Sequence, residues 1–214
     1  MGVLLMLMTI GGVIVAATLF TVAWLNESAW LKKFVLGGVA IWFLFYAVML
    51  IGASLTSEEK VLGLNEPKQF CGFYLDCHLH AAVSGVRTAK TIRDREANGD
   101  FYVVTVKVFS DAKRATLGLL TVDAHVVDPA GRAYTRDEMA EALLEPQPEF
   151  ETKIGPEKSL EKQIVFDLPA DVKQPRLDIR EGYGIDHAIE LFLIGDEDSI
   201  FHARTFIALH DRDQ

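Results

Sequence analysis

Two cysteines and two histidines lie close together in the segment Cys71-Gly-Phe-Tyr-Leu-Asp-Cys-His-Leu-His80. Thiolates and imidazoles are the side chains that bind zinc and copper in proteins. Apolar and polar residues alternate along the segment with a period of two, which is typical of a half-buried β-strand. In one regular strand the cysteines share the apolar face and the histidines share the opposite face. The four side chains are therefore not expected to bind one ion together.

The spacing of the cysteines also argues against a disulfide bond between them. Cys71 and Cys77 are six residues apart, so their Cα atoms are roughly 20 Å apart in an extended strand. A disulfide needs a separation below about 7 Å. We therefore expect two buried free thiols. The spacing also differs from the Cys-x3-Cys-x3-His motif of the copper-bearing subunit of haem–copper oxidases and from the haem-attaching Cys-x2-Cys-His.

The polar face of the same strand offers a weaker candidate for a metal site. Asp76, His78 and His80 lie at alternate positions and share this face. A His-x-His pair on a strand can bind zinc if a neighbouring segment supplies a third ligand, and His125 is a possible source. The alternative is an ordinary solvated strand face without an ion.

The remaining polar residues predict no catalytic centre. His187, His202 and His210 are scattered among expected strand residues and are interpreted as surface or edge groups. The run Asp196-Glu-Asp198 has the oxygen ligands that calcium prefers, but it lacks the spacing of a calcium-binding loop, so we expect a solvated hairpin tip. A nucleophile elbow, a glycine-rich phosphate loop and a paired-carboxylate motif are all missing from the sequence. We therefore expect neither an enzyme nor a bound cofactor.

The charge distribution divides the chain into two physically different regions. The 214 residues include 30 acidic and 21 basic side chains, yet the first 55 residues contain only Glu27, Lys32 and Lys33 as charged groups. Two apolar runs, residues 3–25 and 34–55, each reach the ~20 residues that a membrane-spanning helix needs. No basic residue precedes the first run, so we predict a retained helix rather than a cleaved signal peptide. Residues 1–56 are thus expected to form a transmembrane α-helical hairpin.

Basic residues in the linker of this hairpin predict its orientation. Lys32 and Lys33 follow the positive-inside tendency, which places the linker in the cytoplasm and both termini outside. The chain is then a two-pass protein of the bacterial inner membrane, and its C-terminal domain lies on the periplasmic or extracellular side. Trp24 and Trp30 suit an interfacial belt around the linker.

Small residues on both helices suggest how the helices pack. Such residues allow close approach of helix backbones in lipid. They are interpreted as the seam of the hairpin itself, and the alternative is that they also attach it to a larger membrane assembly. The residues are Gly11, Gly12, Ala16, Gly37 and Gly38.

The rest of the chain has the pattern of an antiparallel β-sandwich. Residues 57–68 are interpreted as a polar tether and residues 69–214 as one domain. Short β-branched and aromatic segments separated by turn residues predict the strands, and no long helices lie between them. The predicted strands are 69–83, 86–92, 101–109, 119–127, 132–134, 150–154, 160–168, 176–179, 188–194 and 200–209.

Turns and one helix complete this prediction. Asn98-Gly99 is typical of a tight hairpin turn, and Asp128-Pro-Ala-Gly131 has proline and glycine at the positions that a β-turn favours. Thr135 and Glu138 resemble a capping box, which predicts a short surface helix over residues 136–144. Gly195–Ser199 is expected to be a polar loop between the last two strands.

Several segments together resemble a known family. They are Asp100–Phe109, Val126–Tyr134, Ile164–Pro169 and Pro175–Ile179. Over roughly residues 100–180 the chain is similar to bacterial immunoglobulin-like extracytoplasmic domains of unknown function, which are related in fold to mycobacterial immunoprotective antigens. The resemblance implies an immunoglobulin-like sandwich outside the cytoplasm and transfers no catalytic residue. A signal peptide or lipid anchor usually precedes such domains, and the helical hairpin departs from that pattern.

These observations lead to one expected function and two alternatives. The acidity of the outer domain disfavours nucleic-acid binding, which requires a basic surface. We expect a non-enzymatic, membrane-anchored interaction or scaffolding module, an accessory subunit of a bacterial membrane complex of respiratory or photosynthetic type. Its expected partners are the lipid bilayer and other membrane protein subunits. The first alternative is a metal-binding or redox subunit that uses His78 and His80, and the second is a hydrolase.

Overall fold

The computed structural model describes residues 2–71 and 77–210. Contacts within the chain form two compact units. One comprises Met1–Glu58 and Asp186–Arg204, and the other comprises Glu59–Ile185 and Thr205–Gln214. The prediction instead assigned everything after residue 68 to one domain. The first unit is helical and the second is built of strands.

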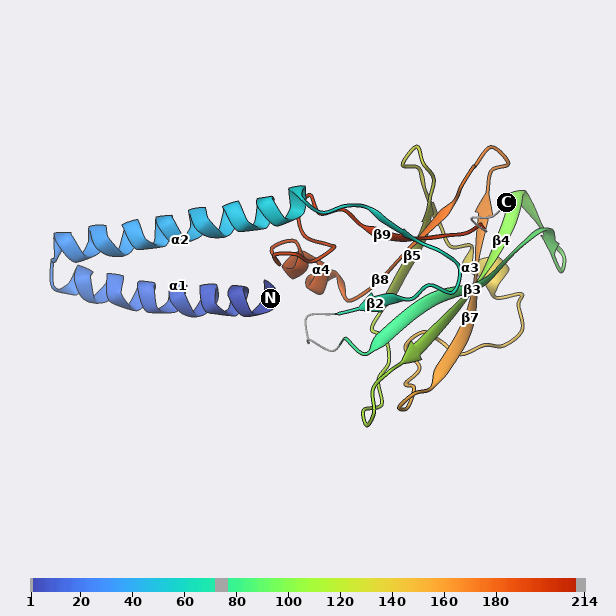
Figure 1. Cartoon of the computed structure of the whole chain (residues 1–214), viewed down its shortest axis with the longest axis horizontal. Helices are drawn as coiled ribbons and strands as arrows, with labels where there is room; N and C mark the ends of the chain where they lie inside the picture. Colours follow the sequence, from blue (N-terminus) through green and yellow to red (C-terminus); the bar gives the residue numbers. More distant parts are fainter. Residues whose placement is uncertain (1, 72–76, 211–214) are drawn as a thin grey trace. The chain divides into compact units, whose positions relative to one another are not determined.

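The first unit is centred on two helices that run antiparallel to each other (Figure 1). Helix α1 spans Gly2–Leu25, and helix α2 spans Ala29–Leu55, so α2 begins earlier than predicted. Both are long and apolar enough to cross a membrane, and most of their large apolar side chains are exposed. These properties allow both helices to be membrane spans, and they also fit a signal sequence at the N-terminus.

The small residues of the helices border a groove between them. Gly12, Ala16 and Gly38 line an apolar cavity of about 400 Å³. A Cβ atom added at Gly12 or Gly38 would meet no other atom within 4 Å, so the helix backbones are not in close contact at these positions. One polar contact joins the helices beside the groove, since Trp42 Nε1 donates to Thr9 Oγ1 at 3.1 Å. The glycines therefore leave room for another apolar segment.

Residues 186–204 return to the helices and belong to the same unit. Tyr46 donates its hydroxyl to the carbonyl oxygen of Phe192 at 2.6 Å, and the Ser54 and Ser199 hydroxyls are 3.3 Å apart. Gly2 lies so close to this segment that an added Cβ would be 2.6 Å from the Ile194 carbonyl oxygen. A side chain at residue 2 would therefore displace the segment.

The second unit is a β-sandwich, as predicted (Figure 1). One sheet has the order β1-β9-β8-β5-β6 and the other has the order β2-β3-β4-β7. All pairings are antiparallel except β1 with β9. Apolar side chains of both sheets form one buried core between them. The strands are β1 (Lys60–Leu62), β2 (Lys68–Phe70), β3 (Leu79–Ile92), β4 (Arg95–Ser110), β5 (Val122–Val127), β6 (Ala133–Thr135), β7 (Ser159–Leu168), β8 (Arg176–Glu181) and β9 (Thr205–Ala208).

Several predicted elements are wrong in type or extent. Residues 188–194 do not form a strand, because helix α4 (Gly184–Glu190) occupies their first part. Residues 150–154 contribute only an isolated bridge between Leu117 and Ile154. Of residues 200–209 only β9 is a strand. Short apolar runs do not by themselves distinguish a strand from a buried turn or helix, which explains these errors.

The hairpin turn between β3 and β4 lies earlier than predicted. The strands pair up to Ile92 with Arg95, so the turn is formed by Arg93 and Asp94. Asn98-Gly99 is instead inside β4. Gly99 approaches β7 so closely that an added Cβ would be 2.1 Å from the Leu168 carbonyl oxygen. Glycine at this position permits the close contact between β4 and β7 and does not form a turn.

The predicted short helix exists but is smaller and begins differently. Helix α3 spans Glu138–Glu141, and Asp137 rather than Thr135 caps it, because the Asp137 carboxylate accepts a hydrogen bond from the Ala140 N–H. Thr135 is already paired with His125 at the end of β6. Ala140 packs against Val103 and Val165 on the outer face of the four-stranded sheet.

The prediction of two buried free thiols is wrong. Cys71 and Cys77 form a disulfide, with Cα atoms 4.3 Å apart, and Cys71 is exposed. The prediction assumed one continuous strand through both cysteines. Strand β2 instead ends at Phe70, and β3 begins at Leu79, antiparallel to it and paired with it. The antiparallel pairing of β2 and β3 therefore brings the two cysteines within disulfide distance.

Helix α3 and the residues on either side of it cover part of the outer edge of β7. The Asp137 N–H donates to the Val165 carbonyl oxygen at 2.8 Å, and the Val165 N–H donates to Glu141 Oε1 at 3.0 Å. Further along, the Gln147 side-chain amide exchanges two hydrogen bonds with the Gln163 backbone. Among the described residues, strand β6 lies at the end of the other sheet and is paired with β5 alone. The edge of β7 is thus protected, whereas β6 presents an open edge.

Candidate functional site

The predicted histidine pair on β3 converges on one carboxylate. His78 Nδ1 lies 2.6 Å from Asp111 Oδ1, and His80 Nε2 lies 3.2 Å from Asp111 Oδ2. The hydrogen bond from His78 is the main reason that the pKa of Asp111 is lowered. Asp76, the other predicted ligand of this face, lies outside the described residues. The arrangement provides two imidazoles and one exposed carboxylate.

His125, the predicted third ligand, lies on the opposite side of the sandwich. Its strand neighbours Ala124 and Val126 point into the core, as Leu79 and Ala81 do beside His80. His125 and His80 therefore lie on the outer faces of different sheets. His125 Nε2 is 3.3 Å from Asp178 Oδ2. A metal at His78 and His80 stays a prediction, and it would have to be completed without His125.

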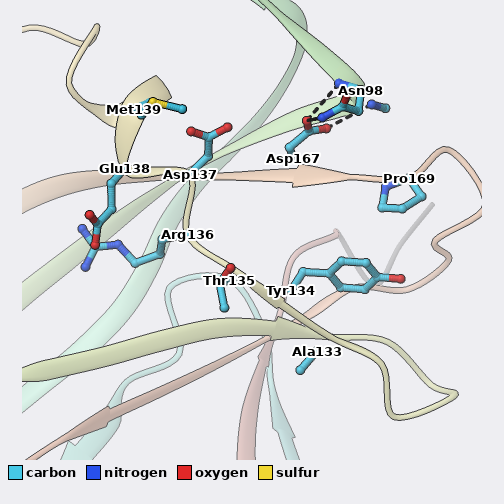
Figure 2. A pocket seen from close by; sticks show the side chains of 11 residues that line it. Asn98, Ala133, Tyr134, Thr135, Arg136, Asp137, Glu138, Met139, Asp167 and Pro169 are labelled. Carbon is cyan, nitrogen blue, oxygen red and sulfur yellow. Dashed lines mark hydrogen bonds between the residues drawn. The ribbon is translucent and has the colours of Figure 1, made fainter.

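A groove lies beside β6 in the sandwich unit (Figure 2). Its volume is about 710 Å³. Strand β6, the residues that lead into α3, and two segments of the four-stranded sheet provide its walls. The lining residues are Asn98, Gly99, Ala133, Tyr134, Thr135, Arg136, Asp137, Glu138, Met139, Asp167 and Pro169.

Hydrogen bonds hold one wall of this groove in place. The Asp167 carboxylate accepts from the Asn98 N–H at 2.9 Å, from the Asn98 side-chain amide at 2.8 Å and from the Gly99 N–H at 3.0 Å. Burial raises the pKa of Asp167, but the hydrogen bonds from Asn98 and Gly99 outweigh it, so its pKa is lowered overall. Asp167 is therefore ionised at neutral pH.

The opposite wall contains two arginine–carboxylate pairs. Arg95 Nη2 is 2.8 Å from Asp137 Oδ2, and Arg136 makes a two-point contact with Glu141 at 2.9 and 2.5 Å. Two-point contacts of this kind fix side-chain orientation as well as charge. Both walls of the groove are thus ordered in advance of any binding.

Tyr134 gives the groove a polar group that the chain itself does not use. Its hydroxyl is buried and has no hydrogen-bond partner among the described residues. Figure 2 shows its ring among the other side chains that line the groove. A buried hydroxyl without a partner costs free energy, and a bound group with a donor or acceptor would remove that cost.

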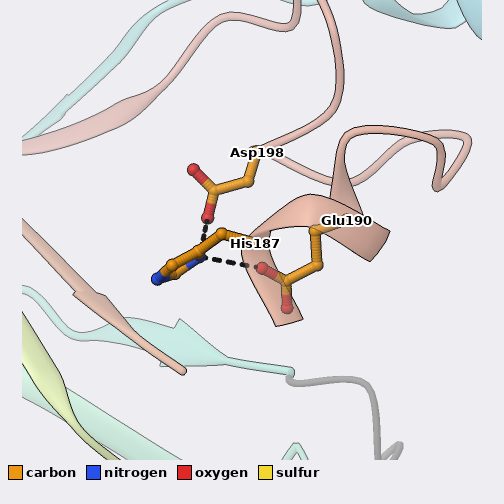
Figure 3. Close-up of side chains that lie close together, drawn as sticks. All are labelled: His187, Glu190 and Asp198. Carbon is orange, nitrogen blue, oxygen red and sulfur yellow. Dashed lines mark hydrogen bonds and ion pairs between the residues drawn. The ribbon is translucent and has the colours of Figure 1, made fainter. Parts of the chain in front are cut away.

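A second cluster lies in the helical unit, where the sequence predicted only a strand and a hairpin tip (Figure 3). His187 and Glu190 come from α4, and Asp198 comes from the loop that follows it. Their ligand atoms all lie within 4.8 Å of one another. His187 Nδ1 is 3.1 Å from Glu190 Oε2 and 3.6 Å from Asp198 Oδ2.

Burial and neighbouring acids change the protonation of this cluster. Burial, followed by repulsion from Asp196, raises the pKa of Glu190 to about 7. Burial also raises the pKa of Asp196, and the neighbouring Asp198 adds to the rise. Two carboxyl groups therefore flank one imidazole, and a third, that of Asp196, lies close to Glu190. The sequence signal for this site was a His-x-x-Glu spacing, which places both side chains on one face only in a helix.

Comparisons with known proteins give a distant likeness in fold. No known sequence family and no curated protein matches the chain. Among solved structures, the secreted protein MPT63 from Mycobacterium tuberculosis matches with 13% identity and a TM-score of 0.42, over 61% of this chain and 95% of MPT63. An uncharacterized β-sandwich protein from Clostridium difficile 630 matches with 12% identity and a TM-score of 0.36, over 72% of this chain and 98% of that protein.

Proposed function

We propose that this chain is a non-enzymatic, membrane-anchored interaction module whose β-sandwich lies outside the cytoplasm. In this role it is an accessory subunit of a bacterial membrane complex. One observation carries the proposal: the sandwich presents an ordered groove beside an unprotected sheet edge, in a chain that also has two helices long enough to span a bilayer. We further propose that the sandwich is of the immunoglobulin-like type.

The helical unit supports a retained two-pass anchor in the inner membrane. A cleaved signal peptide would have no reason to contact mature residues, yet Gly2 packs against the backbone of Ile194. The apolar surface also extends beyond the helices into residues 186–204, where Phe192 and Phe201 are 59% and 70% exposed. Exposed apolar side chains gathered in this way suit contact with a membrane.

The disulfide supports the outer location of the sandwich. Structural disulfides form in the periplasm and outside the cell and are rare in the cytoplasm. Cys71 and Cys77 are joined in this way, and the same side of the membrane follows from Lys32 and Lys33 in the positive-inside interpretation. Two independent features therefore favour the same orientation.

The groove fits an extended segment of a partner protein. A strand with an open edge can bind such a segment through its backbone, and neighbouring pockets then select the side chains. Strand β6 supplies the edge, and Met139, which is 67% exposed, supplies an apolar contact. The carboxylates Asp137, Glu138, Glu141 and Asp167 outnumber the two arginines paired beside them, Arg95 and Arg136, so a basic segment is favoured.

The anchor offers a second contact for the same partner complex. The cavity between α1 and α2 is apolar and lined by Gly12, Ala16 and Gly38. Small residues and free space permit a helix of another subunit to approach closely in lipid. Together the two contacts would place the module beside a larger membrane protein.

Purification of the full chain in mild detergent, followed by mass spectrometry, tests the proposal. We expect a partner in stoichiometric amount. The variants Tyr134→Phe and Met139→Glu should each lower its recovery, Met139→Glu by roughly tenfold, which corresponds to 1.4 kcal/mol. Tyr134→Phe removes only a hydroxyl that has no hydrogen-bond partner in residues 2–71 and 77–210, so the folding stability of the variant should not fall.

Thr116→Glu is the matched control for Met139→Glu. It adds the same charge at another exposed position of the sandwich that does not line the groove. Recovery of the partner should be unchanged in this variant. Purification of a lone monomer without a partner would overturn the proposed function. If all three variants recover as much partner as the wild-type chain, the groove is not the contact surface.

A further inference from the structure

We infer that His187, Glu190 and Asp198 bind a divalent transition-metal ion, with zinc as the expected occupant. The site is independent of the groove and of the proposed protein contact, and it uses none of the predicted zinc ligands Asp76, His78, His80 and His125. Nitrogen and carboxylate oxygen donors of this kind are typical zinc ligands. A water molecule would complete four coordination.

The distances among the three donors fit one small ion. Donors that lie about 2.0–2.1 Å from a tetrahedral zinc ion lie roughly 3.3 Å from each other. The distances from His187 Nδ1 to Glu190 Oε2 and to Asp198 Oδ2 are 3.1 and 3.6 Å. An ion placed between these atoms would therefore require only small side-chain movements.

The donors are already held in place by the chain. His187 and Glu190 occupy one face of α4 because they are separated by three residues. The Asp198 N–H donates to Asp196 Oδ1 at 3.0 Å, which orients the loop that carries the third donor. Figure 3 shows the imidazole between the two carboxylates. Pre-ordered ligands reduce the entropy lost on metal binding.

The surroundings favour a dication over a protonated histidine. The Glu190 and Asp198 side chains are only 8% and 11% exposed, and Asp196 adds a third carboxyl group close to them. A single imidazolium has one Nδ1 proton to share between two carboxylates. A divalent ion satisfies the imidazole and both carboxylates at once and compensates more of the buried negative charge.

Metal binding would cross-link two parts of residues 186–204, the segment that contacts α2. Glu190 and His187 precede Phe192, whose carbonyl accepts from Tyr46, and Asp198 precedes Ser199, which contacts Ser54. One ion would therefore join the two stretches of the segment that contact α2. The expected role is structural.

Zinc binding to the full-length protein in detergent tests the inference. After treatment with a chelator and dialysis against zinc, elemental analysis should give one zinc per wild-type chain. His187→Gln and Glu190→Gln should each lower the affinity at least tenfold in calorimetric titration. His202→Gln is the matched control from the same segment, because His202 Nδ1 contacts its neighbour's carbonyl oxygen instead. His80→Gln is a control for the strand face.

Thermal unfolding separates loss of the site from loss of the fold. Without metal, Glu190→Gln should unfold at the wild-type temperature or above, because the change removes a buried charge. Zinc should raise the unfolding temperature of the wild-type chain and of both controls, but not of Glu190→Gln. Less than stoichiometric zinc in the wild type, or wild-type affinity in both site variants, would overturn the inference.

Discussion

At the scale of single residues, Asp167 explains how the groove keeps its shape. Its carboxylate accepts three hydrogen bonds from Asn98 and Gly99, where β4 passes very close to β7. The tight approach requires glycine at position 99, and the two N–H groups beside it need an acceptor. Asn98 and Gly99 thus make a short polar link between strands, although their sequence is that of a turn.

We predict that Asp167→Asn lowers the free energy of unfolding of the sandwich by about 1–3 kcal/mol at pH 7, since one amide oxygen replaces a charged acceptor. The folded pKa of Asp167 lies below its ordinary value of 3.8. Its stabilising effect is therefore complete above pH 3.8 and is lost as the pH falls through the folded pKa. Hydrogen exchange of the β4 and β7 amides at pH 7 and in acid measures this difference.

Asp100→Asn is the control for this prediction. Asp100 is also an aspartate on β4, but it pairs with the exposed Lys90, and such surface pairs contribute little. Its replacement should change stability by less than 1 kcal/mol. A deficit in Asp167→Asn of equal size at both pH values would contradict the electrostatic explanation.

At the scale of elements, the β2–β3 pair shows why local pattern alone misplaced the cysteines. The sequence pattern predicts one continuous strand over residues 69–83, but β2 ends at Phe70 and β3 begins at Leu79, antiparallel to it. The alternation of side chains predicts the face on which each residue lies only if the strand is continuous. Leu79 and Ala81 do point into the core as expected, and His80 points away.

The disulfide should stabilise this pair of strands. Replacing both Cys71 and Cys77 by serine should lower the free energy of unfolding of the sandwich by about 2 kcal/mol, because the closed loop is short. Hydrogen exchange of the β2 and β3 amides reports the change, and treatment of the wild-type chain with a reductant should reproduce it. Exchange rates that are identical in the wild type and the double variant would contradict the prediction.

Helix α4 is the element whose interpretation from sequence failed most completely. Its acidic residues Asp186 and Glu190 are buried, whereas Ile185 is 70% exposed. This is the reverse of the pattern that identifies a helix in a water-soluble domain. A rule based on apolar periodicity therefore assigns such a segment to another element, and the His187 cluster is lost with it.

At the scale of the whole molecule, the sequence correctly predicted two long apolar helices followed by a β-rich region. Two long charge-free runs and a set of β-branched segments are strong signals, and the two helices and the strands β4, β5, β7 and β8 lie where they indicated. The groove and the metal cluster depend on contacts between distant segments, such as Asp167 with Asn98 and His187 with Asp198. No local pattern contains that information.

Orientation in the membrane gives the prediction that belongs to this scale. A reporter enzyme that is active only outside the cytoplasm, fused after Gln214, should be active. The same reporter inserted in the linker between α1 and α2, beside Lys32, should be inactive. The opposite result would place the sandwich in the cytoplasm, where the Cys71–Cys77 disulfide would be reduced.

All three tryptophans of the chain, Trp24, Trp30 and Trp42, belong to α1 and α2. Tryptophan fluorescence therefore reports on the helical hairpin and contains no signal from the sandwich. Quenchers attached at known depths along lipid tails would report the depth of the linker end of the hairpin through Trp24 and Trp30, and of the middle of α2 through Trp42. The two units can thus be followed separately in a single sample, without attaching any dye.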